Sequence, residues 1–240
     1  MKKFAMESAF VLLLAVSGFS QTEFLEQDAS GIHPYAGLKW NSKITQPVLG
    51  FEYLIESRAA VGVQFGFPLK DTVFATPGKD TSVGKAKFHS HFINPYVQFE
   101  FLEPDNTNKF SLAVRADFIY ETAPADDSLN DYSHMSYGIG PVAAVRLHAN
   151  EKIDVVPQLA YEFFYTKSKV NWVTYNNGVG LFRDASLLQH DVSAAADVLY
   201  HLTETQGLNL EPKIVLKLGE GRQGSDLFNI DLHIGYFWSF

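Results

Sequence analysis

The chain has 240 residues, of which 46% are hydrophobic and 14% aromatic, and its formal net charge is −8. This acidic balance argues against a nucleic-acid partner, because proteins that bind DNA or RNA neutralise phosphates with a basic surface. The chain contains no cysteine, which excludes disulfides and thiolate metal sites. The length, with no Pro/Gly/Ser-rich linker in the sequence, favours one large domain.

The first 20 residues have the features of a secretory signal peptide. Lys2 and Lys3 precede an apolar stretch over residues 9–16, and small residues then offer a cleavage site. The apolar stretch is shorter than the roughly 20 residues that a membrane-spanning helix needs. The sequence therefore predicts a removed signal peptide over residues 1–20 and a single mature domain over residues 21–240.

Segments in which apolar and polar residues alternate follow one another along the rest of the chain. Alternate side chains of a β-strand point to opposite faces, so each segment predicts a strand with one apolar and one polar face. The apolar faces over residues 61–67, 110–120, 153–165 and 208–218 carry no charge, as expected where a charge would meet lipid at a cost of roughly 2–4 kcal/mol. We count about ten segments, with eight or twelve as alternatives: 33–42, 47–57, 58–69, 87–102, 109–121, 134–148, 152–167, 186–201, 207–218 and 227–240.

The connections between these segments alternate between short and mostly longer ones. The longer, polar ones cover residues 71–86, 122–133 and 168–185. Outer-membrane barrels have short periplasmic turns and longer external loops. The three long connections are therefore expected to face outside, where they could contact an extracellular ligand.

The last segment places Trp238 and Phe240 on its apolar face. A strand that ends in this way resembles the closing strand of bacterial outer-membrane β-barrels, in which the final Phe is recognised during insertion. The resemblance implies an all-β fold, a transmembrane antiparallel up-and-down β-barrel integral to the outer membrane of a Gram-negative cell. It also implies that Phe240 is an assembly signal, and that the partners are outer-membrane lipids and the barrel assembly machinery.

Four prolines inside the predicted strands leave a competing fold open. Each proline removes a hydrogen bond from the ladder unless a bulge or a strand end absorbs it. They are Pro95, Pro141, Pro157 and Pro212. The alternative fold is a secreted soluble barrel or sandwich, which would bury its apolar face inside.

The charged residues of the polar faces are predicted to meet inside the barrel. Folding the chain back near residues 205 and 222 places Asp197, Lys213 and Asp231 in one lateral row. The interleaved acids and bases indicate a self-satisfied polar core, and a barrel of eight to ten strands is nearly filled by its side chains. The predicted lumen network consists of Arg115, Asp117, Arg146, Asp154, Asp197, Lys213, Lys217, Asp231 and His233.

One residue pattern could supply a hydrolytic site. His134 and Ser136 lie two residues apart, so a base and a nucleophile share one strand face, as in outer-membrane lipid hydrolases. In those enzymes the pair faces lipid. Here it lies on the same strand face as Gly138 and Gly140 and is expected to face the lumen.

Two further patterns have weaker support. Asp231-x-His233 resembles the Asp-His pair of ten-stranded outer-membrane proteases, but it lies deep in the last strand. His89-x-His91 could begin a metal site, yet no third ligand has suitable spacing. We therefore expect no cofactor and no metal.

Taken together, the residues favour a small outer-membrane barrel with a structural or surface-interaction role over an enzyme. The alternatives are an outer-membrane hydrolase of lipid or peptide at the outer rim, and a narrow channel for small solutes.

Overall fold

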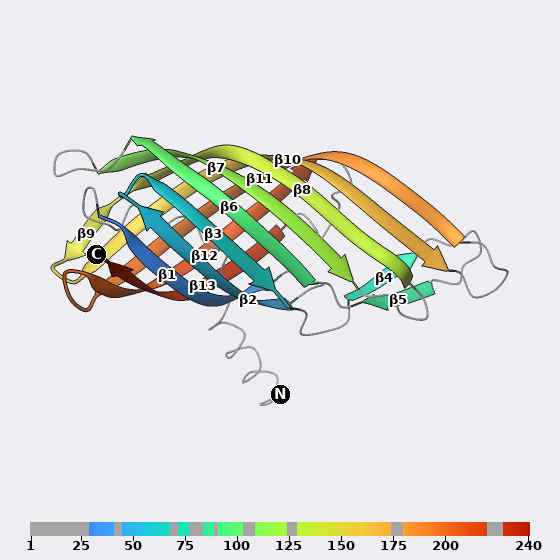
Figure 1. Cartoon of the computed structure of the whole chain (residues 1–240), viewed down its shortest axis with the longest axis horizontal. Coiled ribbons are helices and arrows are strands. Elements are labelled where there is room, and N and C mark those ends of the chain that lie inside the picture. The colour runs from blue at the N-terminus through green and yellow to red at the C-terminus, as the bar shows by residue number, and fades with distance from the viewer. Residues whose placement is uncertain are drawn as a thin grey trace, which may run out of the picture.

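The computed structural model describes nine stretches of the chain: residues 29–40, 45–67, 72–76, 84–88, 91–102, 109–123, 129–173, 180–219 and 228–240. The predicted signal peptide lies outside these residues. The described part of the chain has no helix that is long and apolar enough to cross a membrane. Its regular structure consists of β-strands (Figure 1).

The strands follow one another along the chain with mostly short connections. Their bounds are β1 (Gly31–Trp40), β2 (Thr45–Ile55), β3 (Ala59–Gly66), β4 (Thr72–Thr76), β5 (Gly84–Phe88), β6 (His91–Leu102), β7 (Phe110–Ala123), β8 (Leu129–Val145), β9 (Leu147–Asn150), β10 (Ile153–Val173), β11 (Gly180–His201), β12 (Gln206–Gly219) and β13 (Phe228–Ser239).

Ten strand positions form a closed antiparallel barrel. Each strand of the wall pairs with its neighbour in the chain, and β13 pairs with β1 to close the ring. β8 and β9 occupy one wall position, because both pair with β10 and are separated only at Arg146. The predicted ten-stranded, up-and-down transmembrane barrel is thus confirmed.

Tight turns lie at one end of the barrel, on the left in Figure 1. The β2–β3 turn joins the register partners Ile55 and Ala59 through three residues, and two of them, Glu56 and Ser57, have positive φ angles (49° and 51°). Phe240 lies at the same end, where its N–H donates to Ser30 O at 2.8 Å. Outer-membrane barrels have short periplasmic turns, so we call this the periplasmic end and the opposite end extracellular.

Strands extend into the three stretches that the sequence predicts to be long loops. Residues 71–86 contain β4 and most of β5, which form a two-stranded hairpin. β8 begins at Leu129, and β10 and β11 pair as far as Val173 and Gly180. The prediction ended these strands too early because, beyond the membrane, both faces of a strand meet water and alternation loses its meaning.

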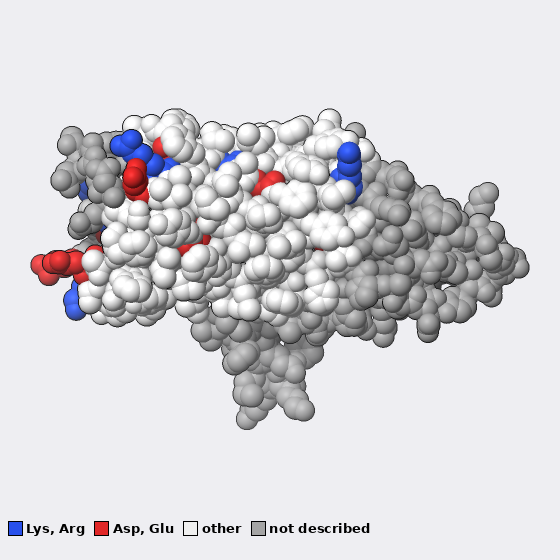
Figure 2. Space-filling view, viewed as in Figure 1, with Lys and Arg blue, Asp and Glu red and all other residues white. Residues whose placement is uncertain are grey.

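The outer wall is apolar and the interior is polar. In β12 buried and exposed residues alternate, with Leu210, Ile214 and Leu216 outside and Glu211 and Lys213 inside. Figure 2 shows that the wall in view is largely uncharged, with charges gathered mainly at its periplasmic end. A soluble barrel would have the opposite arrangement, so the alternative of a soluble barrel is wrong.

The strand prolines are accommodated on the outer face without a change of register. Pro141 pairs with Val114 of β7 on one side. On the other side, β8 pairs with β10. The register is the same on both sides of the proline, as the pairs Ile139–Phe163 and Ala143–Leu159 show. Pro95, Pro157 and Pro212 are likewise exposed. The missing N–H therefore weakens the ladder on one side of each strand only.

Aromatic rings in the lumen lie against glycines of neighbouring strands. A Cβ atom added to any of these glycines would stand 1.9–2.3 Å from an atom of its partner's ring. The cross-strand pairs are Gly50–Tyr35, Gly62–Tyr96, Gly66–Phe92, Gly138–Phe164 and Gly207–Phe237. These rings fit into the interior because the glycine at the paired position of the neighbouring strand leaves room for them.

Apolar side chains are buried in the periplasmic part of the lumen. Leu54, Val156 and Leu199 are fully buried and Phe237 is 2% exposed. Val156, Leu199 and Phe237 belong to one contact cluster with Ala144, whereas Leu54 packs on Ala60 of the next strand. We call Leu54, Val156, Leu199 and Phe237 the apolar plug.

Candidate functional site

The central lumen contains a buried ion pair on β7. Arg115 Nε donates to Asp117 Oδ2 at 2.8 Å and Arg115 Nη2 to Asp117 Oδ1 at 2.9 Å. The two residues share a face because they are two positions apart in a strand. Asn94 Nδ2 also donates to Asp117, and the guanidinium lies 3.9 Å from the ring centroid of Tyr96. Both charges are thereby compensated inside the barrel.

The predicted row of Asp197, Lys213 and Asp231 is wrong at its first member. Lys213 is the register partner of Asp231 on β13 but of Ala195 on β11. The reason is the β11–β12 turn, which centres on Glu204 because His201 pairs with Gly207. The prediction placed this turn near residue 205, and a shift of one residue in a turn moves the partner by two.

Asp197 and Asp231 therefore have different neighbours. Asp197 is fully buried and accepts hydrogen bonds from Gln158 Nε2 (2.7 Å) and Asn209 Nδ2 (3.3 Å). Asp231 pairs in register with Lys213 on one side and with Lys39 on the other. The row that the structure contains is thus Lys39–Asp231–Lys213, and Lys39 was missing from the predicted network.

The remaining members of the predicted network lie on the same inner wall. Lys217 Nζ is 3.8 Å from Asp191 Oδ2. His233 Nδ1 is 3.7 Å from Glu211 Oε2, and its ring lies 4.7 Å from that of Tyr35. Around the row of charges a small cavity of about 60 Å³ remains, lined among others by Lys39, Arg115, Glu162, Lys213 and Asp231.

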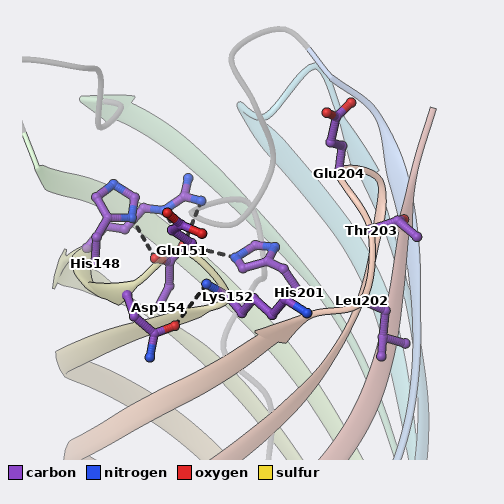
Figure 3. A pocket seen from close by; sticks show the side chains of 10 residues that line it. His148, Glu151, Lys152, Asp154, His201, Leu202, Thr203 and Glu204 are labelled. Atoms are coloured by element: carbon purple, nitrogen blue, oxygen red, sulfur yellow. Dashed lines mark hydrogen bonds and ion pairs between the residues drawn. The ribbon is translucent and has the colours of Figure 1, made fainter.

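A larger pocket of about 550 Å³ opens at the periplasmic mouth (Figure 3). At its base Asp154 accepts hydrogen bonds from Arg146 Nε (3.0 Å) and Nη2 (2.8 Å). His148 Nδ1 lies 2.6 Å from Asp154 Oδ1, and His201 Nε2 lies 3.1 Å from Oδ2. One carboxylate thus holds the β9–β10 turn to the end of β11.

The sequence placed Arg146 near Asp154, and the structure brings them together. The sequence did not point to His148 or His201. His148 could have been found by counting back from the turn at Glu151, since His148 is the register partner of Asp154. His201 could not, because its position depends on how β11 returns beside β10.

The His134–Ser136 pattern forms a hydrogen-bonded pair inside the lumen wall. Ser136 Oγ lies 3.1 Å from His134 Nε2 and 2.8 Å from Thr166 Oγ1. Thr166 donates in turn to Gln189 Oε1 at 3.2 Å. Ser136 is 4% exposed and Thr166 fully buried, so the serine hydroxyl is part of a buried polar chain and does not face lipid.

The other two patterns do not assemble a site in the described part of the chain. Asp231 and His233 are each 1% exposed and thus buried in the barrel. His89 lies outside the described residues. His91 contacts the ring of Phe67, and the described residues contain no group of three or more His, Asp or Glu that could hold a metal ion.

Comparisons with known proteins agree with this architecture. No protein-family model matches the sequence, and curated proteins give no match either. Among solved structures, the outer membrane protease OmpT from Escherichia coli superposes with a TM-score of 0.52 at 8% identity, covering 89% of this chain and 94% of that one. The translocator domain of the autotransporter NalP from Neisseria meningitidis gives 0.53 at 9% identity, covering 90% of each chain.

At these identities the similarity concerns the fold alone, so no catalytic residue of the protease is carried over. The membrane location is supported by the outer wall itself, where large apolar side chains such as Leu159 (64% exposed) and Ile139 (56%) point away from the lumen. The shared fold and this apolar wall identify the chain as an integral outer-membrane β-barrel of the Gram-negative type.

Proposed function

We propose that the protein is a closed outer-membrane scaffold that acts through its extracellular end and conducts no solutes. The observation that supports a closed lumen is the apolar plug. Leu54, Val156 and Leu199 come from three separate strands and are fully buried. A path for solutes would have to pass this level of the barrel.

The extracellular end offers a surface for interactions. β10 and β11 contain 21 and 22 residues, about twice the 9–11 residues that a transmembrane strand needs. β12 pairs with β11 only as far as Gln189–Gly219. The pairing of β10 with β11 from Tyr165–Leu188 to Val173–Gly180 therefore continues past the described end of β12, while β8 pairs with the other side of β10 as far as Trp172–Leu129. We call these paired residues of β10 and β11 the β10–β11 hairpin.

The buried charges fit this role better than catalysis. Arg115, Asp117 and Asp154 have their hydrogen bonds satisfied by side chains of the wall itself. A buried ion pair holds its geometry when both partners are satisfied, and it is costly when one is removed. In a scaffold the Asp154 cluster holds β10 to β9 and β11, and Asp117 links β7 to Asn94 of β6.

Conductance tests the first half of the proposal. Refolded wild-type protein in planar bilayers should show no stepwise currents, whereas the Leu54→Ala/Leu199→Ala double variant should open a small conductance. Heat modifiability on gels verifies that both proteins are folded. Stepwise currents in the wild type would contradict the closed lumen and favour the narrow channel.

Deletion of the hairpin tip tests the second half. Residues 168–185 can be replaced by Asn-Gly, because Lys167 and Ser186 are direct register partners and Asn-Gly forms a two-residue turn. The shortened barrel should fold normally but lose binding of protein-coated beads to immobilised fibronectin, collagen or heparin. Equal bead binding by both proteins, or by neither, would contradict a role for the hairpin.

The same preparations test the hydrolase alternative. Wild-type protein should release no fatty acid from phospholipid or lipid A. If it does, and Ser136→Ala or His134→Ala abolishes the release in a folded barrel, the protein is an enzyme and the scaffold proposal is wrong.

A further inference from the structure

The lipid-facing wall contains a hydrogen-bonded polar pair on β10 and β11. Tyr161 Oη lies 2.5 Å from His190 Nδ1, and their ring centroids are 5.8 Å apart. His190 is in the outward phase of β11, between the exposed residues Leu188 and Val192. Ionisable side chains are rare on a lipid-facing surface, where they mark functional positions. This pair therefore requires an explanation that the scaffold role does not give.

Strand register places the pair near the outer-leaflet surface. His190 pairs with Phe163 of β10 and with Leu218 of β12, one residue before β12 ends at Gly219. The next outward position toward the extracellular end of β10 is Tyr165, which pairs with Tyr137 of β8. These tyrosines are in the position of an interfacial aromatic belt.

A cation lies directly above this belt. Lys167 is exposed on the outer face, two residues beyond Tyr165, and its Nζ lies 5.7 Å from the centroid of the Tyr165 ring. From the extracellular side inward, the surface thus presents an ammonium group, a tyrosine ring and then the Tyr161–His190 pair. We call Lys167, Tyr165, Tyr161 and His190 the outer patch.

Whichever of the two residues donates the hydrogen bond within the Tyr161–His190 pair, the pair keeps one donor and one acceptor for a ligand. If Tyr161 O–H donates to His190 Nδ1, the ring keeps an Nε2–H donor and the phenol oxygen keeps a lone pair. If Nδ1–H donates instead, Tyr161 keeps its O–H donor and Nε2 is the acceptor. The pair can therefore satisfy an amide or a hydroxyl group of a lipid that lies just below the head group.

We propose that the outer patch binds a phosphorylated glycolipid of the outer leaflet, with Lys167 on the phosphate and the Tyr161–His190 pair on an amide or hydroxyl at the root of the acyl chains. Charge and depth support this occupant: an ammonium attracts phosphate at the membrane surface. His190, level with Phe163, lies two outward positions deeper than Lys167, and Tyr161 lies three positions deeper. A phospholipid such as phosphatidylglycerol offers the phosphate but no amide at that depth.

The test uses refolded full-length protein in phosphatidylcholine nanodiscs, titrated with lipid A, with dephosphorylated lipid A or with phosphatidylglycerol. Bound lipid is counted by native mass spectrometry. Lys167→Gln should weaken lipid A binding about fivefold, as expected for the loss of one surface cation near an anionic lipid. The same variant should bind dephosphorylated lipid A like the wild type.

His190→Leu and Tyr161→Phe should weaken both forms of lipid A, because the contact that they remove is independent of phosphate. Both replacements suit a lipid-facing position, so folding is retained and heat modifiability verifies it. Arg58→Gln, an exposed cation at the opposite end of the barrel, is the matched control and should bind like the wild type.

Two results would overturn the proposal. One is equal lipid A binding by wild type, Lys167→Gln and His190→Leu. The other is wild-type binding of phosphatidylglycerol as tight as that of lipid A, which would mean a non-selective attraction of anionic lipids. Neither result depends on conductance or on the hairpin deletion, so this proposal and the proposed function fail separately.

Discussion

The ring of Tyr96 occupies the space where a side chain on Gly62, its direct partner on the neighbouring strand, would stand. A Cβ atom on Gly62 would lie 2.2 Å from Tyr96 Cζ. In this position Tyr96 Oη donates to Glu52 Oε2 at 2.9 Å, and the ring lies under the Arg115 guanidinium. One glycine thus permits a ring that organises two buried charges.

Gly62→Ala should therefore destabilise the barrel by about 1–3 kcal/mol, the range for overpacking a filled interior. The loss should appear in urea unfolding of the refolded protein in lipid bilayers. In a Tyr96→Ala background the same Gly62→Ala change should cost much less, because the clash has gone. Equal costs in both backgrounds would show that the ring and the glycine are not coupled.

Arg115→Met should destabilise the barrel by about 3–5 kcal/mol. Removing the guanidinium leaves Asp117 buried beside Glu162, and an uncompensated buried charge is costly. Adding Asp117→Asn to this variant should restore part of the stability. Lys152→Met, in an exposed periplasmic turn, serves as the control and should be nearly silent in the same unfolding measurement.

Ile214→Arg should cost roughly 2–4 kcal/mol, because Ile214 is 49% exposed on the outer wall near the middle of β12. Thr203→Arg, in the exposed β11–β12 turn, should have little effect. Insertion yield and urea unfolding in bilayers measure both. Free tolerance of arginine at position 214 would mean that this face does not meet lipid.

Asp154→Asn should loosen the periplasmic mouth while the rest of the barrel remains intact. The change removes the charge that Arg146, His148 and His201 share, at a cost of about 1–3 kcal/mol. Hydrogen exchange should rise in β9 and in the β11–β12 turn. Glu204 lines the same pocket without contacting Asp154 in Figure 3. The control variant Glu204→Gln should therefore leave hydrogen exchange unchanged.

The wall of the barrel could be predicted from the sequence because lipid imposes a strict alternation on each strand. The ten predicted segments match the ten wall positions, and the match is weakest at the extracellular ends of β10 and β11. There the alternating constraint ends, since water covers both faces. Hydrogen bonding between β10 and β11 then continues without a pattern that reveals it.

The interior was harder to predict, because pairing across strands depends on the position of each turn. The Arg115–Asp117 pair lies within one strand and follows from spacing alone. Lys39, by contrast, meets Asp231 only because β1 closes on β13, a pairing between residues far apart in the sequence. Contacts made by closure are outside the reach of hairpin counting.

Closure also determines the order in which the barrel can form. Every other wall contact joins neighbouring strands and can develop hairpin by hairpin, whereas the Gly31–Ser239 and Lys39–Asp231 pairs need almost the whole chain. Until they form, the sheet has two open edges, which are the sites where strands of other molecules add. The seam between β1 and β13 is therefore the place where a folding helper would have to hold the unfinished sheet.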